Sequence, residues 1–109
     1  MKVQWTEAAR LDVRNIFRYI ARDSPVSAVR VLRKLRNRAA TLSSHARRGR
    51  VVPELAELGE SSYRELVVDP YRLIYRIERT VVRVHVVIDG RRDVRQVLSE
   101  RSSRPEEQS

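Results

Sequence analysis

The apolar residues in the first half of the chain form two stripes with helical spacing. The first stripe repeats every three or four residues and consists of Ala9, Val13, Ile16, Phe17 and Ile20. The second stripe has the same spacing and consists of Ala28, Leu32, Leu35, Ala39 and Leu42. Between them stands Ser24-Pro25, and Ser is a good helix N-cap while Pro fits the first helical position. The pattern therefore predicts two amphipathic helices joined by a short turn, as an antiparallel hairpin.

Strand-like segments lie on both sides of the predicted hairpin. Val3–Trp5 precedes it, and residues 63–68, 71–78 and 81–88 follow it. Short connections, Asp69-Pro70 and Arg79-Thr80, separate the last three segments. Such spacing is typical of an antiparallel meander, so we expect these three strands to be neighbours in one sheet.

The rest of the chain has a weaker pattern. Residues 51–61 are predicted to be irregular, and residues 92–98 to form a short last helix. Residues 99–109 lack apolar side chains apart from one proline, so we expect a disordered tail after a single domain over residues 1–98. The predicted fold class is α+β: an N-terminal strand, then an antiparallel helical hairpin packed on one face of a mostly antiparallel sheet, completed by the three-stranded meander.

Period-two alternation predicts what each face of the sheet carries. On one face we place Tyr71, Leu73, Tyr75, Ile77, Val82, Val84, Val86 and Ile88. On the other we place Arg72, Ile74, Arg76, Glu78, Arg83, His85 and Val87. The first face is hydrocarbon and must be covered by the hairpin. The second is rich in arginine, and it is where we look for function.

The charge of the chain narrows the class of partner. Its 109 residues include 23 Lys and Arg against 14 Asp and Glu, a formal net charge of +9, and only Lys2 and Lys34 are lysines. Arginine pairs bidentately with phosphate and carboxylate, so the composition favours nucleic acid, a nucleoprotein or an acidic polypeptide. The alternative is a general preference for arginine on solvated surfaces.

Cysteine and membrane signals are both missing from the sequence. With no cysteine, disulfides and thiolate metal sites are excluded, and a reducing, cytoplasmic location is expected. No apolar run approaches the roughly 18–20 residues that cross a bilayer, so no membrane partner is expected.

Several segments in a fixed order carry a resemblance to a known family. Gly49–Leu55, Tyr63–Val68, Pro70–Ile77 and Gly90–Asp93 resemble the RelE/ParE toxins of type II toxin–antitoxin systems, and the likeness spans roughly residues 3–98. It implies a growth-arresting toxin that is neutralised by a cognate antitoxin, whose acidic C-terminal segment wraps around it. It implies no cofactor and no metal.

The resemblance leaves the cellular target open between two mechanisms. ParE-like members bind DNA gyrase and poison or inhibit it, whereas RelE- and YoeB-like members are endonucleases that cut mRNA, usually on the ribosome. We take the ParE-like action as the leading interpretation, because Gly90–Val94 lacks the histidine or tyrosine that YoeB-like nucleases carry after the last strand. His85 lies in mid-strand and is expected to be structural. A non-toxic binding module of the same fold is a third alternative.

The resemblance also implies candidate site residues for the nuclease alternative. Glu54 matches the general base and Arg72 the arginine that holds the scissile phosphate. The ordinary interpretation makes Glu54 an exposed loop carboxylate and Arg72 a sheet arginine paired with Glu65 or Glu78, or with the antitoxin. Five further arginines are candidates for binding phosphate or an acidic partner: Arg50, Arg64, Arg76, Arg91 and Arg92.

Overall fold

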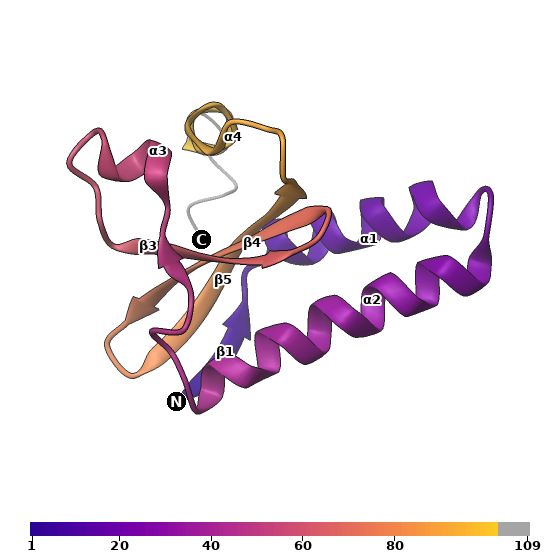
Figure 1. Cartoon of the computed structure of the whole chain (residues 1–109), viewed down its shortest axis with the longest axis horizontal. Coiled ribbons are helices and arrows are strands. Elements are labelled where there is room, and N and C mark those ends of the chain that lie inside the picture. Colours follow the sequence, from indigo (N-terminus) through magenta and orange to yellow (C-terminus); the bar gives the residue numbers. More distant parts are fainter. Residues whose placement is uncertain (103–109) are drawn as a thin grey trace.

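A helical hairpin covers one face of a five-stranded sheet in the computed structural model, which describes residues 1–102 (Figure 1). The elements in chain order are β1 (Lys2–Trp5), α1 (Glu7–Ala21), α2 (Pro25–Ala40), the 3-10 turn η1 (Thr41–Ser43), β2 (Arg50–Val51), α3 (Pro53–Ala56), β3 (Tyr63–Val68), β4 (Tyr71–Glu78), β5 (Val81–Asp89) and α4 (Val94–Ser102). This order confirms the predicted α+β class. The stretch 51–61, which we predicted to be irregular, contains the end of β2 and the short helix α3.

The sheet has the order β1-β5-β4-β3-β2. β3, β4 and β5 form the predicted antiparallel meander, and β2 adds an antiparallel pair of residues to the outer edge of β3. β1 runs parallel to β5, with Lys2 opposite Val81 and Trp5 opposite Val84. The hairpin is therefore the crossover between β1 and the rest of the sheet.

Side-chain caps fix where the two hairpin helices begin. Thr6 Oγ1 accepts a hydrogen bond from the Ala9 amide at 3.1 Å, and Ser24 Oγ accepts one from the Ser27 amide at 3.1 Å. Each cap satisfies an N–H group that the helix cannot pair internally. Pro25 occupies the first turn of α2, as predicted. The caps and stripes together place the apolar sides of both helices against the sheet.

A β-bulge changes which residues of β5 share a face. Tyr75 pairs with Val84 and Ile74 with Val86, so His85 has no opposite partner on β4. An extra residue in one strand reverses the alternation beyond it. We predicted that Val86 would face the hairpin together with Val84, and this is wrong: Val86 belongs to the core on the opposite side of the sheet.

Both faces of the sheet are therefore covered. The hairpin side contains the larger core: Ala9, Val13, Leu35, Ala39, Leu42, Leu66, Val68, Leu73, Tyr75, Val82, Val84 and Val87. α3 and α4 lie on the other side (Figure 1), over a second core of Val52, Leu55, Ile74, Val86, Ile88, Val94 and Val97. The hairpin face is hydrocarbon, as expected, and the opposite face is mixed, with Glu65 and Arg72 beside this second core. The bulge changes only the assignment of the end of β5, because it turns Val86 and Ile88 toward α3 and α4 and Val87 toward the hairpin.

The last helix is longer than predicted. α4 runs to Ser102 rather than Leu98, so residues 99–102, which we expected in the disordered tail, are helical. Arg101 anchors this end, because its Nη2 contacts both carboxylate oxygens of Asp12 at 2.5 Å and its Nη1 donates to the His85 carbonyl. The remainder of the predicted tail, residues 103–109, lies outside the described residues.

Candidate functional site

The two predicted catalytic residues contact each other in a buried ion-pair network. Arg72 of β4 donates from Nη1 and Nη2 to the two carboxylate oxygens of Glu54 in α3, at 2.8 and 2.7 Å. Its Nε donates to Glu65 Oε1 of β3 at 2.7 Å, and its Nη1 also donates to the Arg92 carbonyl at 3.2 Å. Glu65 is 1% exposed and Arg72 is 7% exposed. All three guanidinium nitrogens of Arg72 are thus engaged by the protein itself.

Strand geometry explains why Glu65 and Arg72 meet. Glu65 pairs with Ile74 across the β3–β4 ladder, and Arg72 lies two residues earlier on β4, on the same face. Such diagonal neighbours lie within reach of long side chains. Arg50 of β2 is directly opposite Glu65 and donates to its Oε2 at 2.6 Å. Glu65 is therefore bound by arginines on both sides.

This network sets the charge state of the candidate base. The hydrogen bonds from Arg72 lower the pKa of Glu54 to about 2, against an opposing effect of burial, and the Val94 amide also donates to Glu54 at 3.3 Å. The same bidentate contact with Glu54 raises the pKa of Arg72 above its usual value. A carboxylate whose pKa lies this far below neutral pH is a weak proton acceptor.

The other predicted arginines are dispersed. Arg64 donates to the Gly49 carbonyl at 2.8 Å, and Arg91 pairs with Asp89 on the surface. Arg76 donates to Glu78, farther along β4. The side chain of Arg92 is exposed, and only its backbone carbonyl contacts the Arg72 network. The structure brings Arg50, Arg72 and Glu54 together, and it does not bring Arg91 or Arg76 to them.

A second polar cluster surrounds Glu78 at the far end of β4. Glu78 accepts from Arg83 at 2.8 Å and from Arg76 at 3.0 Å, and its Oε2 is 2.7 Å from His85 Nε2. Burial raises the pKa of Glu78, but hydrogen bonds from His85, Arg83 and Arg76 outweigh it and lower that pKa to about 2. Burial lowers the pKa of His85, against the pull of Glu78. The Tyr63 ring packs edge-on to His85, with centroids 5.7 Å apart. His85 is thus held in a closed network.

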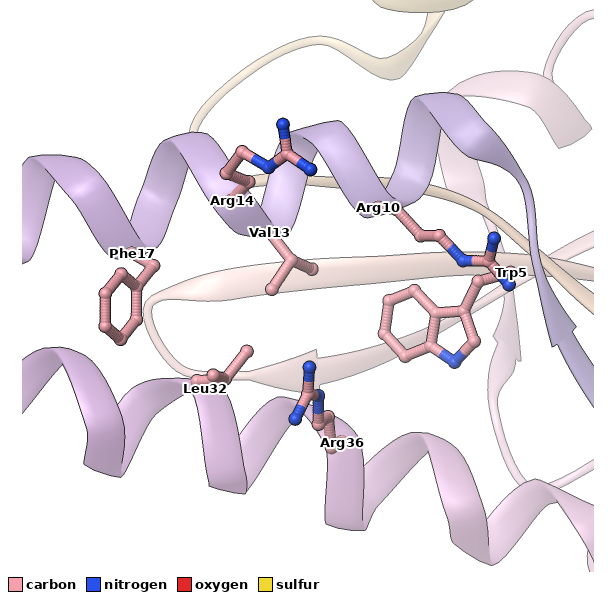
Figure 2. Close-up of a pocket in the computed structure, with 7 residues that line it drawn as sticks. All are labelled: Trp5, Arg10, Val13, Arg14, Phe17, Leu32 and Arg36. Atoms are coloured by element: carbon pink, nitrogen blue, oxygen red, sulfur yellow. The ribbon is translucent and has the colours of Figure 1, made fainter.

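An arginine-lined groove lies between α1 and α2 (Figure 2). Its volume is about 550 Å³, and its lining consists of Trp5, Arg10, Val13, Arg14, Phe17, Leu32 and Arg36. Arg10 and Arg14 come from α1 and Arg36 from α2, and none of the three forms an ion pair within residues 1–102. The apolar members form the remaining walls. This groove combines hydrocarbon surface with unneutralised positive charge.

Sequence reasoning missed the arginines of this groove. It assigned the functional arginines to the sheet. The spacing of these arginines contains the signal that was overlooked. Arg10 and Arg14 are four residues apart and directly follow Ala9 and Val13 of the apolar stripe. They therefore lie at the border of the buried face of α1.

A second hollow, of about 630 Å³, lies between α1, the end of β5 and α4. Its charged lining is mixed, with Asp12, Asp89 and Glu100 beside Arg92 and Arg101. Burial raises the pKa of Asp12 in spite of its contact with Arg101. Mixed charge gives this hollow no preference for one sign of ligand, in contrast to the hairpin groove.

Residues 1–102 contain neither a candidate metal site nor a candidate membrane-spanning helix. No group of three or more His, Asp or Glu side chains in this part of the chain is arranged to hold a metal ion. No helix within it has the length and apolar character needed to span a bilayer.

A β-strand, a helical hairpin and an antiparallel meander, in this order and with this sheet topology, define the α+β class of RelE/ParE-type toxins. The chain matches the model of the family described as "ParE toxin of type II toxin-antitoxin system, parDE" over residues 3–94. It therefore belongs to the ParE toxin family. A solved structure titled "Chromosomal ParDE TA system from P. aeruginosa" has the same fold, with a TM-score of 0.67 and 18% identity, covering 82% of this chain and 95% of that one. No curated protein matches the sequence.

Proposed function

We propose that this ParE-family toxin arrests growth by binding DNA gyrase, without cutting RNA, and that a cognate antitoxin neutralises it by occupying the groove between α1 and α2. Family membership supports the toxin assignment and the existence of an antitoxin. The observation that carries the non-catalytic mechanism is the closed network around Arg72, in which both candidate catalytic side chains are bound to each other.

RNA cleavage needs a base for the 2′-hydroxyl, cations for the phosphorane and an acid for the leaving oxygen. Glu54 has a pKa of about 2 and is bound by Arg72. A phosphate could reach the Arg72 guanidinium only by displacing Glu54, which would lose two short charge-assisted hydrogen bonds. The segment Gly90–Val94 contributes no histidine or tyrosine as an acid. Each of these facts favours binding over catalysis.

The groove between α1 and α2 supports a particular kind of antitoxin segment. Its apolar walls suit a helix or strand with an apolar face, and Arg10, Arg14 and Arg36 suit carboxylates on the border of that face. The groove offers both kinds of contact in one place, whereas Arg72 and Arg76 on the sheet are already paired with the protein's own carboxylates.

Gyrase binding and RNA cleavage are separated by one conservative variant. Glu54→Gln keeps the shape of the side chain but removes its charge and its basicity. We expect purified Glu54→Gln protein to inhibit gyrase supercoiling as the wild type does, while neither protein creates new 5′ ends on mRNA in a translating extract. Loss of toxicity in Glu54→Gln, with a thermal midpoint close to wild type, would instead support the nuclease. Inhibition of translation with no effect on gyrase would overturn the proposed target.

The antitoxin site is tested by charge reversal with a matched control. Arg14→Glu/Arg36→Glu alters the groove, and Arg91→Glu/Arg95→Glu makes the same change of net charge at a distant surface. The readout is growth of cells that express each toxin together with the antitoxin encoded beside it. We expect the groove variant to escape neutralisation and the control to be neutralised. Equal rescue of both variants, with equal binding in a pull-down, would refute the assignment of the groove.

A further inference from the structure

The segment from Ser24 to Pro53 contains no acidic residue. It holds eight of the chain's 23 basic residues and none of its 14 acidic residues. The eight are Arg30, Arg33, Lys34, Arg36, Arg38, Arg47, Arg48 and Arg50. The rest of the chain is therefore close to neutral, and the net charge of +9 comes almost entirely from this segment, which contains α2, the loop that follows it and the start of β2.

The structure leaves nearly all of this charge without a counterion. Of the eight, only Arg50 forms an ion pair within residues 1–102, with Glu65. Arg30, Arg33 and Lys34 lie on the exposed side of α2, and Arg47 and Arg48 are exposed in the loop. On the sheet, by contrast, each of Arg72, Arg76 and Arg83 is paired with a glutamate.

The shape of this surface favours a partner that carries repeated phosphate groups over an amphipathic peptide. Arg36 reaches the groove between the helices, but the outer side of α2 is the convex surface of a helix at the border of the molecule (Figure 1), and its large exposed apolar side chains are Val26 and Val29 near the N-terminal end. A convex helix surface that has no apolar groove cannot bury the apolar side of an amphipathic peptide. Dense, unpaired arginine on a convex surface instead suits repeated phosphate groups.

Helix dimensions favour a DNA duplex over an RNA duplex. An α-helix with its side chains is about 10–12 Å wide, which matches the roughly 12 Å major groove of B-DNA. α2 has 16 residues, so at about 1.5 Å per residue it extends along roughly 24 Å. The major groove of double-stranded RNA is too narrow and deep for such an element. Figure 1 shows α2 at the border of the molecule, with α1 and the sheet on one side only.

We propose that the outer surface of α2 and the loop 44–49 form a binding surface for the phosphate backbone of duplex DNA, without sequence preference. Arg30, Arg33 and Lys34 of α2 contact phosphates on the two sides of the DNA major groove, and Arg47 and Arg48 extend the contact beyond the end of the helix. This surface is distinct from the groove that we assign to the antitoxin. The proposal of a DNA-binding surface does not depend on whether gyrase is the target.

The salt dependence of DNA binding tests this proposal directly. Full-length toxin is titrated against short fluorescent DNA duplexes of two unrelated sequences over a range of salt concentrations, with no gyrase or antitoxin present. The test variant is Arg30→Gln/Arg33→Gln, and the matched control is Arg79→Gln/Arg95→Gln, which removes the same net charge from other surfaces. Glutamine preserves helix propensity, so α2 is retained, and circular dichroism verifies it.

We expect the wild type and the control to bind both duplexes with the same steep salt dependence. Each lost phosphate contact reduces the slope of log affinity against log salt by about 0.9, so the Arg30/Arg33 variant should lose roughly 2 from it. Equal slopes in the two double variants would overturn the proposal. Equal affinity for duplex RNA or for polyglutamate would overturn the assignment to DNA. Either failure leaves gyrase inhibition, measured separately, unaffected.

Discussion

Removal of Arg72 is the sharpest test of the ion-pair network at the centre of the sheet. In Arg72→Met the chain keeps a long side chain at this position, but Glu65, 1% exposed, loses one of its two cationic partners. Breaking a buried pair from one side costs about 3–5 kcal/mol, because a charge is left buried without compensation. Arg50 still donates to Glu65 at 2.6 Å, so we expect a cost near the lower end, about 3 kcal/mol.

Equilibrium urea denaturation measures this loss. For a small domain the free energy of unfolding falls by about 1–3 kcal/mol per molar urea, so the midpoint should move down by roughly 1–3 M. Arg91→Met, which removes an exposed surface pair, should leave the midpoint unchanged. In Arg72→Met/Glu65→Gln the buried charge is gone, and we expect at least half of the loss to be recovered.

Two results would refute this reasoning. One is an Arg72→Met midpoint within experimental error of the wild type, because Glu65 would then be stabilised without Arg72. The other is a double variant no more stable than Arg72→Met, because the cost would then come from lost packing rather than from an unpaired carboxylate. In either case the network would no longer explain why Arg72 is unavailable to a phosphate.

Three further predictions concern the same region. Tyr75→Phe removes an Oη that accepts from the Gly49 amide at 2.9 Å and donates to the Ala46 carbonyl at 2.7 Å, so it should lower the free energy of unfolding by about 1–3 kcal/mol, and an unchanged thermal midpoint would contradict this. Gly49→Ala places a Cβ 2.5 Å from the Glu65 carbonyl oxygen and should destabilise by about 1–3 kcal/mol or more, whereas a stabilised variant in the same assay would refute the contact. The pKa of Glu54 is lowered from 4.5 to about 2, so its contribution to stability is present above about pH 4.5 and is lost as the pH falls toward 2. Urea midpoints across this range should fall more in the wild type than in Glu54→Gln, which keeps only the losses from other carboxylates such as Glu78, and equal falls in the two proteins would refute the reasoning.

Local signals were sufficient to predict the hairpin. The stripes of α1 and α2, the Ser24 cap and Pro25 all act within one or two helical turns, and the structure has each of them. The meander was predicted for the same reason, because short connections force neighbouring strands to pair. Such features depend on residues close together in sequence, which a single sequence displays.

Features that depend on long-range pairing were missed. The bulge at His85 follows from the pairing of Ile74 with Val86, and the alternation of β5 by itself suggests an unbroken strand. The helix α3 has only four residues, too few for a periodic pattern. α4 continues past Leu98 because Arg101 binds Asp12, which lies 89 residues away along the chain.

One of the two ion pairs of Arg72 was predicted from the sequence, and the other was not. Pairing of Arg72 with Glu65 was one of the stated alternatives, because both residues lie on adjacent predicted strands. The bidentate contact with Glu54 was not anticipated, since it requires α3 to fold back over the sheet. The family resemblance marked Glu54 and Arg72 as candidate catalytic residues, whereas their mutual contact favours a role in holding α3 and the sheet together.

The two layers of the molecule use arginine for opposite purposes. A buried guanidinium such as that of Arg72 must have its counterion within the protein, because burial without one would cost several kcal/mol. An exposed arginine such as Arg30 or Arg33 is solvated and needs no internal partner, so its charge stays available to another molecule. Since α2 and its loop lack any carboxylate to neutralise them, a partner of opposite charge gains electrostatic attraction there without breaking an existing ion pair. Function in this toxin should therefore be sought on the hairpin, and the arginines of the sheet should respond to mutation first through stability.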